Sequence, residues 1–583
     1  MSAHGAEELS ASRTLRHLAV DLAGAGLPTL RFDLDGCGDA AGDDLDPGRV
    51  PAWLASIGTA IDALRSHSGC RRGALVGLRL GALLAAQLAR ARPDVVLWAG
   101  VAPVVSGRQY LRELLALGAL HPAQGTVNDA EPLLEAAGFA YTRATREALA
   151  PLGLEALVTP VPGARQGNEV GLDALRLHIF QRDEMPVPAR VLAPLHSGGS
   201  TLTVHGFTGF AAMMDLPHAS QVPQALLAQL RHCLLAASAP AGAMAPPPRG
   251  PRFGRMQARW DAIVERVVQP LSTATGPAGF GVLSLPGAGQ PMRGSVLLLN
   301  AGAIRHVGPS RLHAKLARRW AARGMAVLRL DLSGLGESAP QPGQTDNQVY
   351  STSAVAEVVE AARWLAYHTG IERCQVVGLC AGAYHALQAA MAGAAVEQVV
   401  AINPLVFHYD PAVPITSQAM NAYQAGSVAA VLSGGWRDAG LWQRVWRGQL
   451  PWAKVSGLLA GYVRVRLLRW LQSMGCAAAR LVGKTRPCDL GAHLEALAAR
   501  QVQMSFVFAT GEPGPQLLAQ LGGRRVRVLE RTGALRQQFI ADADHTFTRH
   551  AARQRLMATL DQLVLPDTAP DATAGASPRT TQR

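Results

Sequence analysis

A short segment with glycine at both ends occurs twice in the chain, each time between an apolar run and a stretch rich in Ala and Leu. The first copy spans residues 77–81 (GLRLG) and the second spans residues 378–382 (GLCAG). Glycines at these positions let the backbone pass close to its neighbours, while the central side chain is lifted onto the start of the following helix. The pattern predicts two strand–turn–helix units. Only the second has a nucleophile at its centre, Cys380, because the first has Arg79 there.

The repeat extends well beyond this turn. Residues 30–39 (LRFDLDGCGD) match residues 328–337 (LRLDLSGLGE) at an offset of 298, and the two turns are offset by 301. Nearly equal offsets indicate one duplicated domain. In both copies a helical pattern precedes this strand-like segment and another follows it, and such alternation is typical of a parallel sheet. We therefore predict an α/β chain of two tandem domains, each a mostly parallel sheet with helices on both faces.

Local composition predicts the domain boundaries. Residues 236–252 (AASAPAGAMAPPPRGPR) lack periodicity and are rich in Ala, Pro and Gly, which predicts a linker between a domain at 1–235 and a domain at 253–566. Only the second domain has strand-like segments ahead of the repeated region, at 280–285 and 295–300. The first copy is therefore predicted to be truncated.

Charge and cysteine content restrict the partners and the compartment. The net charge is +13, but nearly all of the basic residues are Arg and no nucleic-acid-binding motif accompanies them, so we expect no nucleic-acid partner. The seven cysteines are scattered, without a CxxC pair or a His-rich metal spacing, which favours a reducing cytoplasm and gives no reason to expect a metal or organic cofactor. No apolar run reaches the roughly 18 residues that cross a bilayer, and a secretion signal is not evident. Residues 567–583 are polar and are expected to be disordered.

Three segments in a fixed order resemble the α/β-hydrolase superfamily. They are the strand-loop at 329–338, the turn at 378–382 and residues 543–547 (ADHTF). The chain is similar to serine aminopeptidase-like hydrolases, and to the tandem hydrolase-like proteins that accompany bacterial polysaccharide loci, over most of both halves. This resemblance implies two α/β-hydrolase-like domains. It says less about the substrate, because the fold hosts many chemistries.

The resemblance makes Cys380 the nucleophile, in place of the Ser that most relatives use, and His545 the general base. The triad acid is expected just after a late strand, at Glu512, with Asp542 or Asp544 as the alternatives. A thiol at the first turn of a helix is near the positive end of the helix dipole, and an adjacent imidazole favours its ionisation. An inert packed cysteine is the other reading, but the strand–turn–helix context favours function.

An acyl-transfer site also needs two backbone donors for the oxyanion. The N–H of Ala381, directly after the nucleophile, is the first candidate. The second is expected from the loop of Ala301, Gly302 and Ala303, whose small side chains leave the backbone accessible.

The first copy is expected to be inactive. A guanidinium stays protonated at neutral pH and is not a nucleophile, so Arg79 cannot replace Cys380. Glu184 and His218 nevertheless occupy the places of the acid and the base, at nearly equal offsets (328 and 327) from their counterparts in the second copy. We predict a fossil site, without an oxyanion loop, in which Glu184 pairs with Arg79.

A long insertion follows the strand that ends near residue 403. A lid is usual at this place in the fold, and we predict a helical cap at about 410–490. The insertion interleaves Trp and Arg residues, and residues 462–471 have the spacing of a basic amphipathic helix. We interpret the insertion first as a cover over an acyl pocket. Contact with a membrane surface or with an acidic acyl carrier protein are the alternatives.

Together these features predict an acyl hydrolase or acyltransferase that acts on a small-molecule ester or thioester through an acyl-enzyme on Cys380. A thiolate with a positioned base handles activated acyl groups more readily than amides in this fold, so esterase or thioesterase activity ranks above peptidase activity. The alternative is a catalytically inert scaffold, in which both sites have decayed and the Trp- and Arg-rich surface binds a partner.

Overall fold

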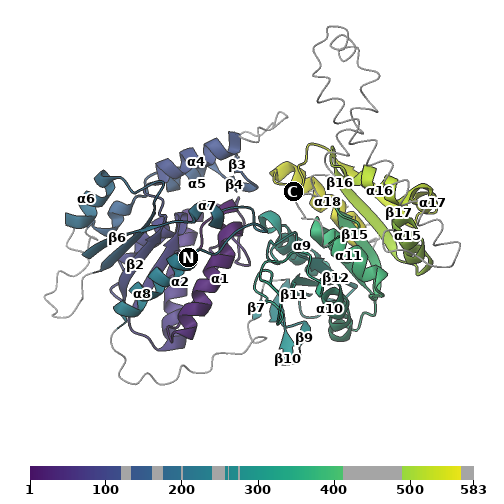
Figure 1. The fold of residues 1–583 in the computed structure, drawn as a ribbon, viewed down its shortest axis with the longest axis horizontal. Helices are drawn as coiled ribbons and strands as arrows, with labels where there is room; N and C mark the ends of the chain where they lie inside the picture. The colour runs from purple at the N-terminus through teal and green to yellow at the C-terminus, as the bar shows by residue number, and fades with distance from the viewer. Residues whose placement is uncertain are drawn as a thin grey trace, which may run out of the picture.

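A computed structural model describes residues 1–119, 133–159, 175–197, 201–238, 257–259, 262–273, 276–410 and 489–565. It contains one main sheet in each half of the chain, and the two halves lie side by side (Figure 1). The first sheet has four parallel strands in the order β1-β2-β5-β6. These strands are β1 (Gly73–Leu78), β2 (Val95–Val101), β5 (Arg176–Arg182) and β6 (Thr201–Phe207).

The second sheet has nine strands. In chain order they are β7 (Gln257–Arg259), β8 (Ile263–Val268), β11 (Phe280–Pro286), β12 (Gly294–Leu299), β13 (Met325–Asp331), β14 (Cys374–Leu379), β15 (Val396–Ile402), β16 (Gln503–Ala509) and β17 (Leu535–Ile540). Their order in the sheet is β17-β16-β15-β14-β12-β13-β11-β8-β7. The pairs from β17 to β13 are parallel, whereas β11 and β8 pair antiparallel with their neighbours. Every residue of β12, β13 and β14 is buried, as expected for central strands covered on both faces.

Helices cover both faces of each sheet. In the first half they are α1 (Ala6–Gly24), α2 (Arg49–Ser68), α3 (Leu80–Ala89), α4 (Gly107–Ala119), α5 (Arg143–Leu149), η1 (Leu154–Leu157), α6 (Ala189–Ser197), α7 (Phe210–Met213) and α8 (Gln224–Ala237). In the second half they are η2 (Pro309–Arg311), α9 (Leu312–Ala321), α10 (Ala354–Thr369), α11 (Ala381–Met391), α15 (Leu490–Ala499), α16 (Gly514–Gly522), α17 (Arg524–Arg531) and α18 (His550–Val564). Short ribbons form from β3 (Leu134–Ala136) with β4 (Phe139–Tyr141), and from β9 (Leu271–Thr273) with β10 (Gly276–Ala278).

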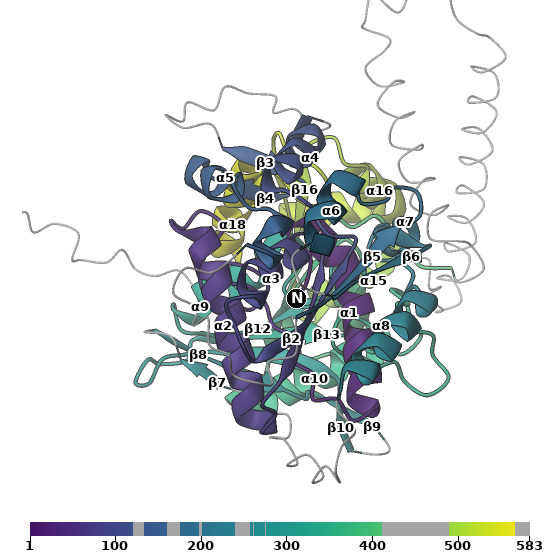
Figure 2. The same cartoon turned by 90° about the vertical axis from the view of Figure 1, so that its left-hand side faces the viewer.

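Each main sheet has two separate apolar clusters, one on each face. In the first half, α2 and α3 pack into one cluster while α1 and α8 pack into the other, and Figure 2 shows α2 and α1 on opposite sides of β2. This layering confirms the predicted α/β class with helices on both faces. Among the described residues, no helix is both long and apolar enough to span a bilayer. The predicted linker, cap and tail lie, apart from their margins, outside the described residues.

One predicted strand is wrong. Residues 30–34 are not a strand, although their counterpart in the second copy is the end of β13. In the second half, β13 hydrogen-bonds to β12, which also pairs with β14. In the first half, β1 pairs with β2 along one edge. Along the other edge, among the described residues of this half, only Met1 hydrogen-bonds to the strand, and its carbonyl accepts from the Leu78 N–H at 3.2 Å. Within the described part of the chain, residues 30–34 therefore have no neighbouring strand whose backbone could accept and donate their hydrogen bonds.

A cavity of about 1280 Å³ lies beside this open edge of the first sheet. Apolar side chains of α1, α2 and β1 line it, and residues of β8 and β11 of the second half line it as well. Neither Cys380 nor His545 is among its lining residues, so the cavity is distinct from the predicted active site.

The two halves contact each other reciprocally. Arg31 forms an ion pair with Glu337, and Arg329 forms one with Asp39. Arg329 is the counterpart of Arg31, and Glu337 is the counterpart of Asp39, each at the offset of 298. Each half thus gives the same surface to the other, which is the pattern of an isologous dimer interface. The duplicated halves therefore associate as a pseudo-symmetric pair.

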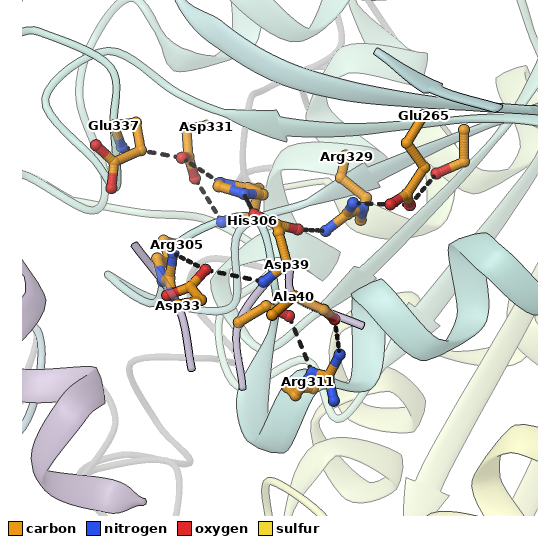
Figure 3. Close-up of polar contacts among 12 residues, drawn as sticks. Asp33, Asp39, Ala40, Glu265, Arg305, His306, Arg311, Arg329, Asp331 and Glu337 are labelled. Atoms are coloured by element: carbon orange, nitrogen blue, oxygen red, sulfur yellow. Dashed lines mark hydrogen bonds and ion pairs between the residues drawn. The ribbon is translucent and has the colours of Figure 1, made fainter. Parts of the chain in front are cut away.

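A buried histidine lies at the centre of this interface (Figure 3). The Nδ1 atom of His306 contacts Asp331 at 2.7 Å, and its Nε2 atom contacts Asp39 of the first half at 2.6 Å. Burial alone would lower the pKa of His306, but the charges of Asp39 and Asp331 raise it to about 9. Asp331 also accepts hydrogen bonds from the backbone N–H groups of His306 and Glu337, so it fixes the loops that contain them.

The raised pKa of His306 predicts that the interface weakens in alkali. An unfolded histidine titrates near 6.5, so this stabilisation is complete below pH 6.5 and is lost as the pH rises through about 9. A shift of this size corresponds to about 3 kcal/mol. We expect the melting temperature to fall more steeply between pH 7 and pH 10 in the wild type than in His306→Gln, measured by differential scanning fluorimetry. Equal slopes in the two proteins would contradict this assignment.

Candidate active site

The second repeated turn has the geometry of a nucleophile elbow. Cys380 lies between β14 and α11 with φ 57° and ψ −112°, a strained conformation for a residue with a side chain. A Cβ atom on Gly378 would lie 2.1 Å from the backbone of Gly382, and one on Gly382 would lie 2.8 Å from the carbonyl of Asn300. Both glycines are therefore required for the tight turn that presents the thiol at the start of α11.

His545 and Glu512 meet at the edge of the second sheet where the parallel strands end. Glu512 follows β16, His545 follows β17, and His545 Nδ1 lies 2.9 Å from Glu512 Oε2. Glu512 is 9 % exposed and His545 is 22 % exposed. When the ring is neutral, a proton on Nδ1 donates to Glu512 and leaves the lone pair of Nε2 available as a base.

The thiol of Cys380 interacts with the same imidazole. Burial alone would lower the pKa of His545, but interactions with Cys380 and Glu512 raise it to about 10. Nε2 is shielded from solvent and has no hydrogen-bond partner of good geometry among the described residues. The raised pKa favours the protonated form of His545 beside the Cys380 side chain.

The two alternative acids do not contact the imidazole. Asp544 accepts a hydrogen bond from the Thr548 N–H at 2.7 Å and so closes the turn before α18. Asp542 has φ 50° in the preceding bend. Neither makes a hydrogen bond to His545, so Glu512 is the carboxylate that contacts the imidazole.

The predicted oxyanion loop lies beside the elbow. Gly302 has φ 60°, and a Cβ added to it would meet no atom of the described residues within 4 Å, so the described part of the chain leaves its backbone accessible. The preceding Asn300 is buried and fixes the loop, because its Nδ2 donates to the carbonyl of Ile304 at 3.0 Å. Ala381 is the first residue of α11, and a first-turn N–H has no partner within its helix. Ala301 is buried and Ala303 is half-buried.

Sequence reasoning missed Asn403, which holds the acid and the base loops together. This residue follows β15 with φ 44° and is fully buried. Its Nδ2 donates to the carbonyl of His545 at 2.8 Å, and its Oδ1 accepts from the N–H of Ala509, three residues before Glu512. At the offset of the two turns its counterpart in the first half is Ala102, also with positive φ. Comparing the two copies position by position would have singled out this asparagine.

We expect Asn403→Ala to reduce kcat about 10- to 100-fold with little change in KM, because a misplaced base is costly while substrate contacts remain. Alanine is compatible with this backbone, since Ala102 has φ 42°. The matched control is Asn347→Ala, which removes another asparagine of positive φ whose Nδ2 donates to the carbonyl of Pro217 at 2.9 Å. Equal kinetic losses in the two variants would contradict a positioning role for Asn403.

An aromatic cluster adjoins the elbow and was also not predicted. The ring of Tyr350 stacks on Tyr409 with centroids 4.6 Å apart and meets Tyr384 of α11 at 5.3 Å. Burial, and next the proximity of Cys380, raise the pKa of Tyr350. Apolar ring surface therefore lies near the thiol.

The predicted fossil site is wrong in its pairing. Arg79 has φ 53° and ψ −120°, almost the conformation of Cys380, so the elbow itself is preserved. Its guanidinium pairs with Glu7 at 2.7 Å and with Glu113, and not with Glu184. Glu184 and His218 lie in exposed loops and make no hydrogen bond to each other. The acidic residues of α1 and α4 lie nearer to the elbow than the loop after β5, and they neutralise the buried Arg79 instead.

The predicted cap, with its Trp and Arg residues and the helix at 462–471, lies outside the described residues. The described part of the site is therefore limited to the elbow, the aromatic cluster and the loops named above.

Comparisons with known proteins returned matches to solved structures alone. No family model matches the chain, and no curated protein matches it. A dienelactone hydrolase from Anabaena variabilis is 13% identical, with a TM-score of 0.29, and the match covers 51% of this chain and 95% of that one. A dienelactone hydrolase-like promiscuous phosphotriesterase from metagenomic libraries is 12% identical, with a TM-score of 0.29, over 52% of this chain and 98% of that one. The strand order and the elbow described above give the second half its α/β-hydrolase-like fold.

Proposed function

We propose that the second half of the chain is an acyl hydrolase or acyltransferase that acts on esters or thioesters through Cys380. The observation that carries this proposal is the geometry of the site, in which a strained elbow presents Cys380 near His545 and the His545 Nδ1 atom lies 2.9 Å from Glu512 Oε2. The raised pKa of His545, through Cys380 and Glu512, is consistent with this arrangement. An inert packed cysteine would have no reason to lie on a strained turn beside a carboxylate-bound imidazole.

The reaction begins with attack of the Cys380 thiolate on the carbonyl carbon of the substrate. The carbonyl electron pair moves to oxygen, which the N–H of Ala381 and an N–H of the 301–303 loop stabilise. Collapse of this intermediate breaks the bond to the alkoxide or thiolate leaving group, and protonated His545 gives that group its proton. An acyl-thioester on Cys380 remains.

His545 is then neutral and acts as a base. It removes a proton from water, or from an alcohol or thiol acceptor, as that group attacks the acyl-thioester. Collapse releases the acid or the transferred acyl product and regenerates the thiolate and the imidazolium. Glu512 holds the ring orientation and stabilises its charge through both steps.

The aromatic cluster supports a substrate with an apolar acyl group. Tyr350, Tyr384 and Tyr409 present ring surface beside the nucleophile, where such a group would pack. Activated acyl groups suit a thiolate nucleophile, so thioesters and aryl esters are the substrates to test first.

The test combines turnover with labelling of the full-length protein. We expect hydrolysis of short-chain p-nitrophenyl esters or acyl thioesters, and rapid alkylation of Cys380 by iodoacetamide at neutral pH, with matching loss of turnover. Cys70, a half-exposed cysteine of the first half, serves as the internal reference in peptide mass spectrometry. Absence of turnover on the whole panel, with Cys380 labelled no faster than Cys70, would favour the inert scaffold instead.

A further inference from the structure

Two histidines and a cysteine converge on one face of the first sheet, away from the elbow. His178 lies on β5, His205 on the neighbouring β6, and Cys233 on α8, which covers this face. His178 Nδ1 is 3.1 Å from His205 Nε2, and Cys233 Sγ is 3.8 Å from the same Nε2. One ligand atom from each of the three residues lies within 4.8 Å of the others.

Two of the three separations are close to those of a tetrahedral zinc centre. With Zn–N bonds of about 2.0–2.1 Å and a Zn–S bond of about 2.3 Å, ligand atoms in a tetrahedron are about 3.3 Å (N to N) and 3.6 Å (S to N) apart. The distances from His205 Nε2 to His178 Nδ1 and to Cys233 Sγ differ from these by only a few tenths of an ångström, and the third pair of ligand atoms lies within 4.8 Å. Side-chain shifts could therefore bring all three atoms onto one metal ion.

The ring of His205 is already held in place. It stacks on Phe180 with centroids 4.5 Å apart and an interplanar angle of 10°, and on His178 at 5.4 Å. Packing of this kind orients a ligand before the metal arrives, which lowers the entropy cost of binding.

We propose that His178, His205 and Cys233 form a zinc site in the first half, with a fourth position open to water. Two imidazole nitrogens and a thiolate are a donor set that suits zinc. Binding forms two Zn–N bonds and one Zn–S bond, and the thiol proton of Cys233 passes to solvent. The site links β5, the edge strand β6 and α8, so its effect is to stabilise the half of the chain that lacks a nucleophile. It does not depend on the proposed activity of Cys380.

The first test is metal titration of the full-length protein after treatment with a chelator. Cobalt(II) should bind once per chain and give a thiolate-to-cobalt charge-transfer band, and zinc should displace it. Loss of an outer partner of a metal ligand typically costs 10- to 100-fold in affinity, so we expect Cys233→Ser and His205→Ala to lose at least about 100-fold. The matched control is Cys70→Ser, which should keep both the band and the affinity.

A second measurement needs no variant. Zinc should slow the alkylation of Cys233 by iodoacetamide in the wild-type protein and leave the rate at Cys70 unchanged, read by peptide mass spectrometry. It should also raise the melting temperature of the wild type. The proposal is overturned if the wild type takes up no zinc at equilibrium, if Cys233→Ser keeps the cobalt band, or if zinc does not protect Cys233.

Discussion

Replacing Cys380 by Ala is expected to lower kcat/KM on the best ester or thioester substrate by at least about 1,000-fold, because the acyl group then has no nucleophile to receive it. His545 and Glu512 would remain hydrogen-bonded, and the oxyanion donors would still bind the carbonyl. The residual rate would be that of water attack promoted by these groups. Initial rates on the wild type and the variant, at equal concentrations of folded protein, check this expectation.

Two variants control for effects elsewhere in the chain. Cys70→Ser removes a half-exposed thiol of the first half and should leave turnover unchanged. Arg79→Ala alters the first elbow by removing the guanidinium that pairs with Glu7 and Glu113, and it should also leave turnover unchanged. A Cys380→Ala protein that keeps more than a tenth of the wild-type rate would show that another group is the nucleophile.

The second large effect concerns the interface between the halves. Asp39 pairs with Arg329, which is fully buried, and with His306, which is 1 % exposed. Asp39→Asn removes one of the charges that balance these two cations, since Glu265 also pairs with Arg329 and Asp331 also contacts His306. Breaking a buried pair in this way costs about 3–5 kcal/mol. Because Asp39 is 30 % exposed, we expect the low end, about 3 kcal/mol, in the free energy of unfolding measured with urea.

The matched control for this variant is Glu147→Gln. That change breaks the pair of Glu147 with Arg143, whose side chains are 64 % and 67 % exposed, and should cost less than about 1 kcal/mol. Equal losses of stability in the two variants would contradict a central role of Asp39 in joining the halves.

Much of the fold could be predicted because steric restrictions on the backbone depend on residues that are close together in the sequence. The glycines at 77, 81, 378 and 382 are each forced by atoms closer than 3 Å, so their spacing reports the turn directly. Most residues of the buried strands β12, β13 and β14 are apolar, so these strands could be recognised from the sequence. Residues 30–34 have the same pattern but form no strand, because strand formation also needs a hydrogen-bonding neighbour, and a local pattern does not report one.

Only part of the candidate site could be predicted from the sequence, because a local pattern does not report contacts between distant segments. Cys380, Glu512 and His545 each follow a strand, and parallel strands bring their carboxyl ends to one edge of the sheet. The partners of Arg79 were mispredicted, because a buried guanidinium pairs with whichever carboxylate the helices bring nearest. Asn403 acts through hydrogen bonds to two distant loops, and no spacing rule reports such contacts.

The cluster of His178, His205 and Cys233 could not be predicted from the sequence either. Its members are 27 and 28 residues apart in the chain, which is no metal-binding spacing, and only the pairing of β5 with β6 under α8 brings them together. The reciprocal pairs Arg31–Glu337 and Arg329–Asp39 were also invisible, although the repeat that places them was plain. The duplication could be recognised in the sequence, whereas the contacts between the two copies could be seen only in the structure.

The most direct test of the account is capture of the acyl-enzyme. The wild-type protein is mixed with excess acyl thioester or p-nitrophenyl ester, quenched in acid after a few milliseconds to seconds, digested and analysed by mass spectrometry. The account predicts one acyl group on the peptide that contains Cys380, formed at least as fast as turnover and absent from Cys380→Ala. Turnover without any acyl group on Cys380, or with the acyl group on another residue, would contradict it.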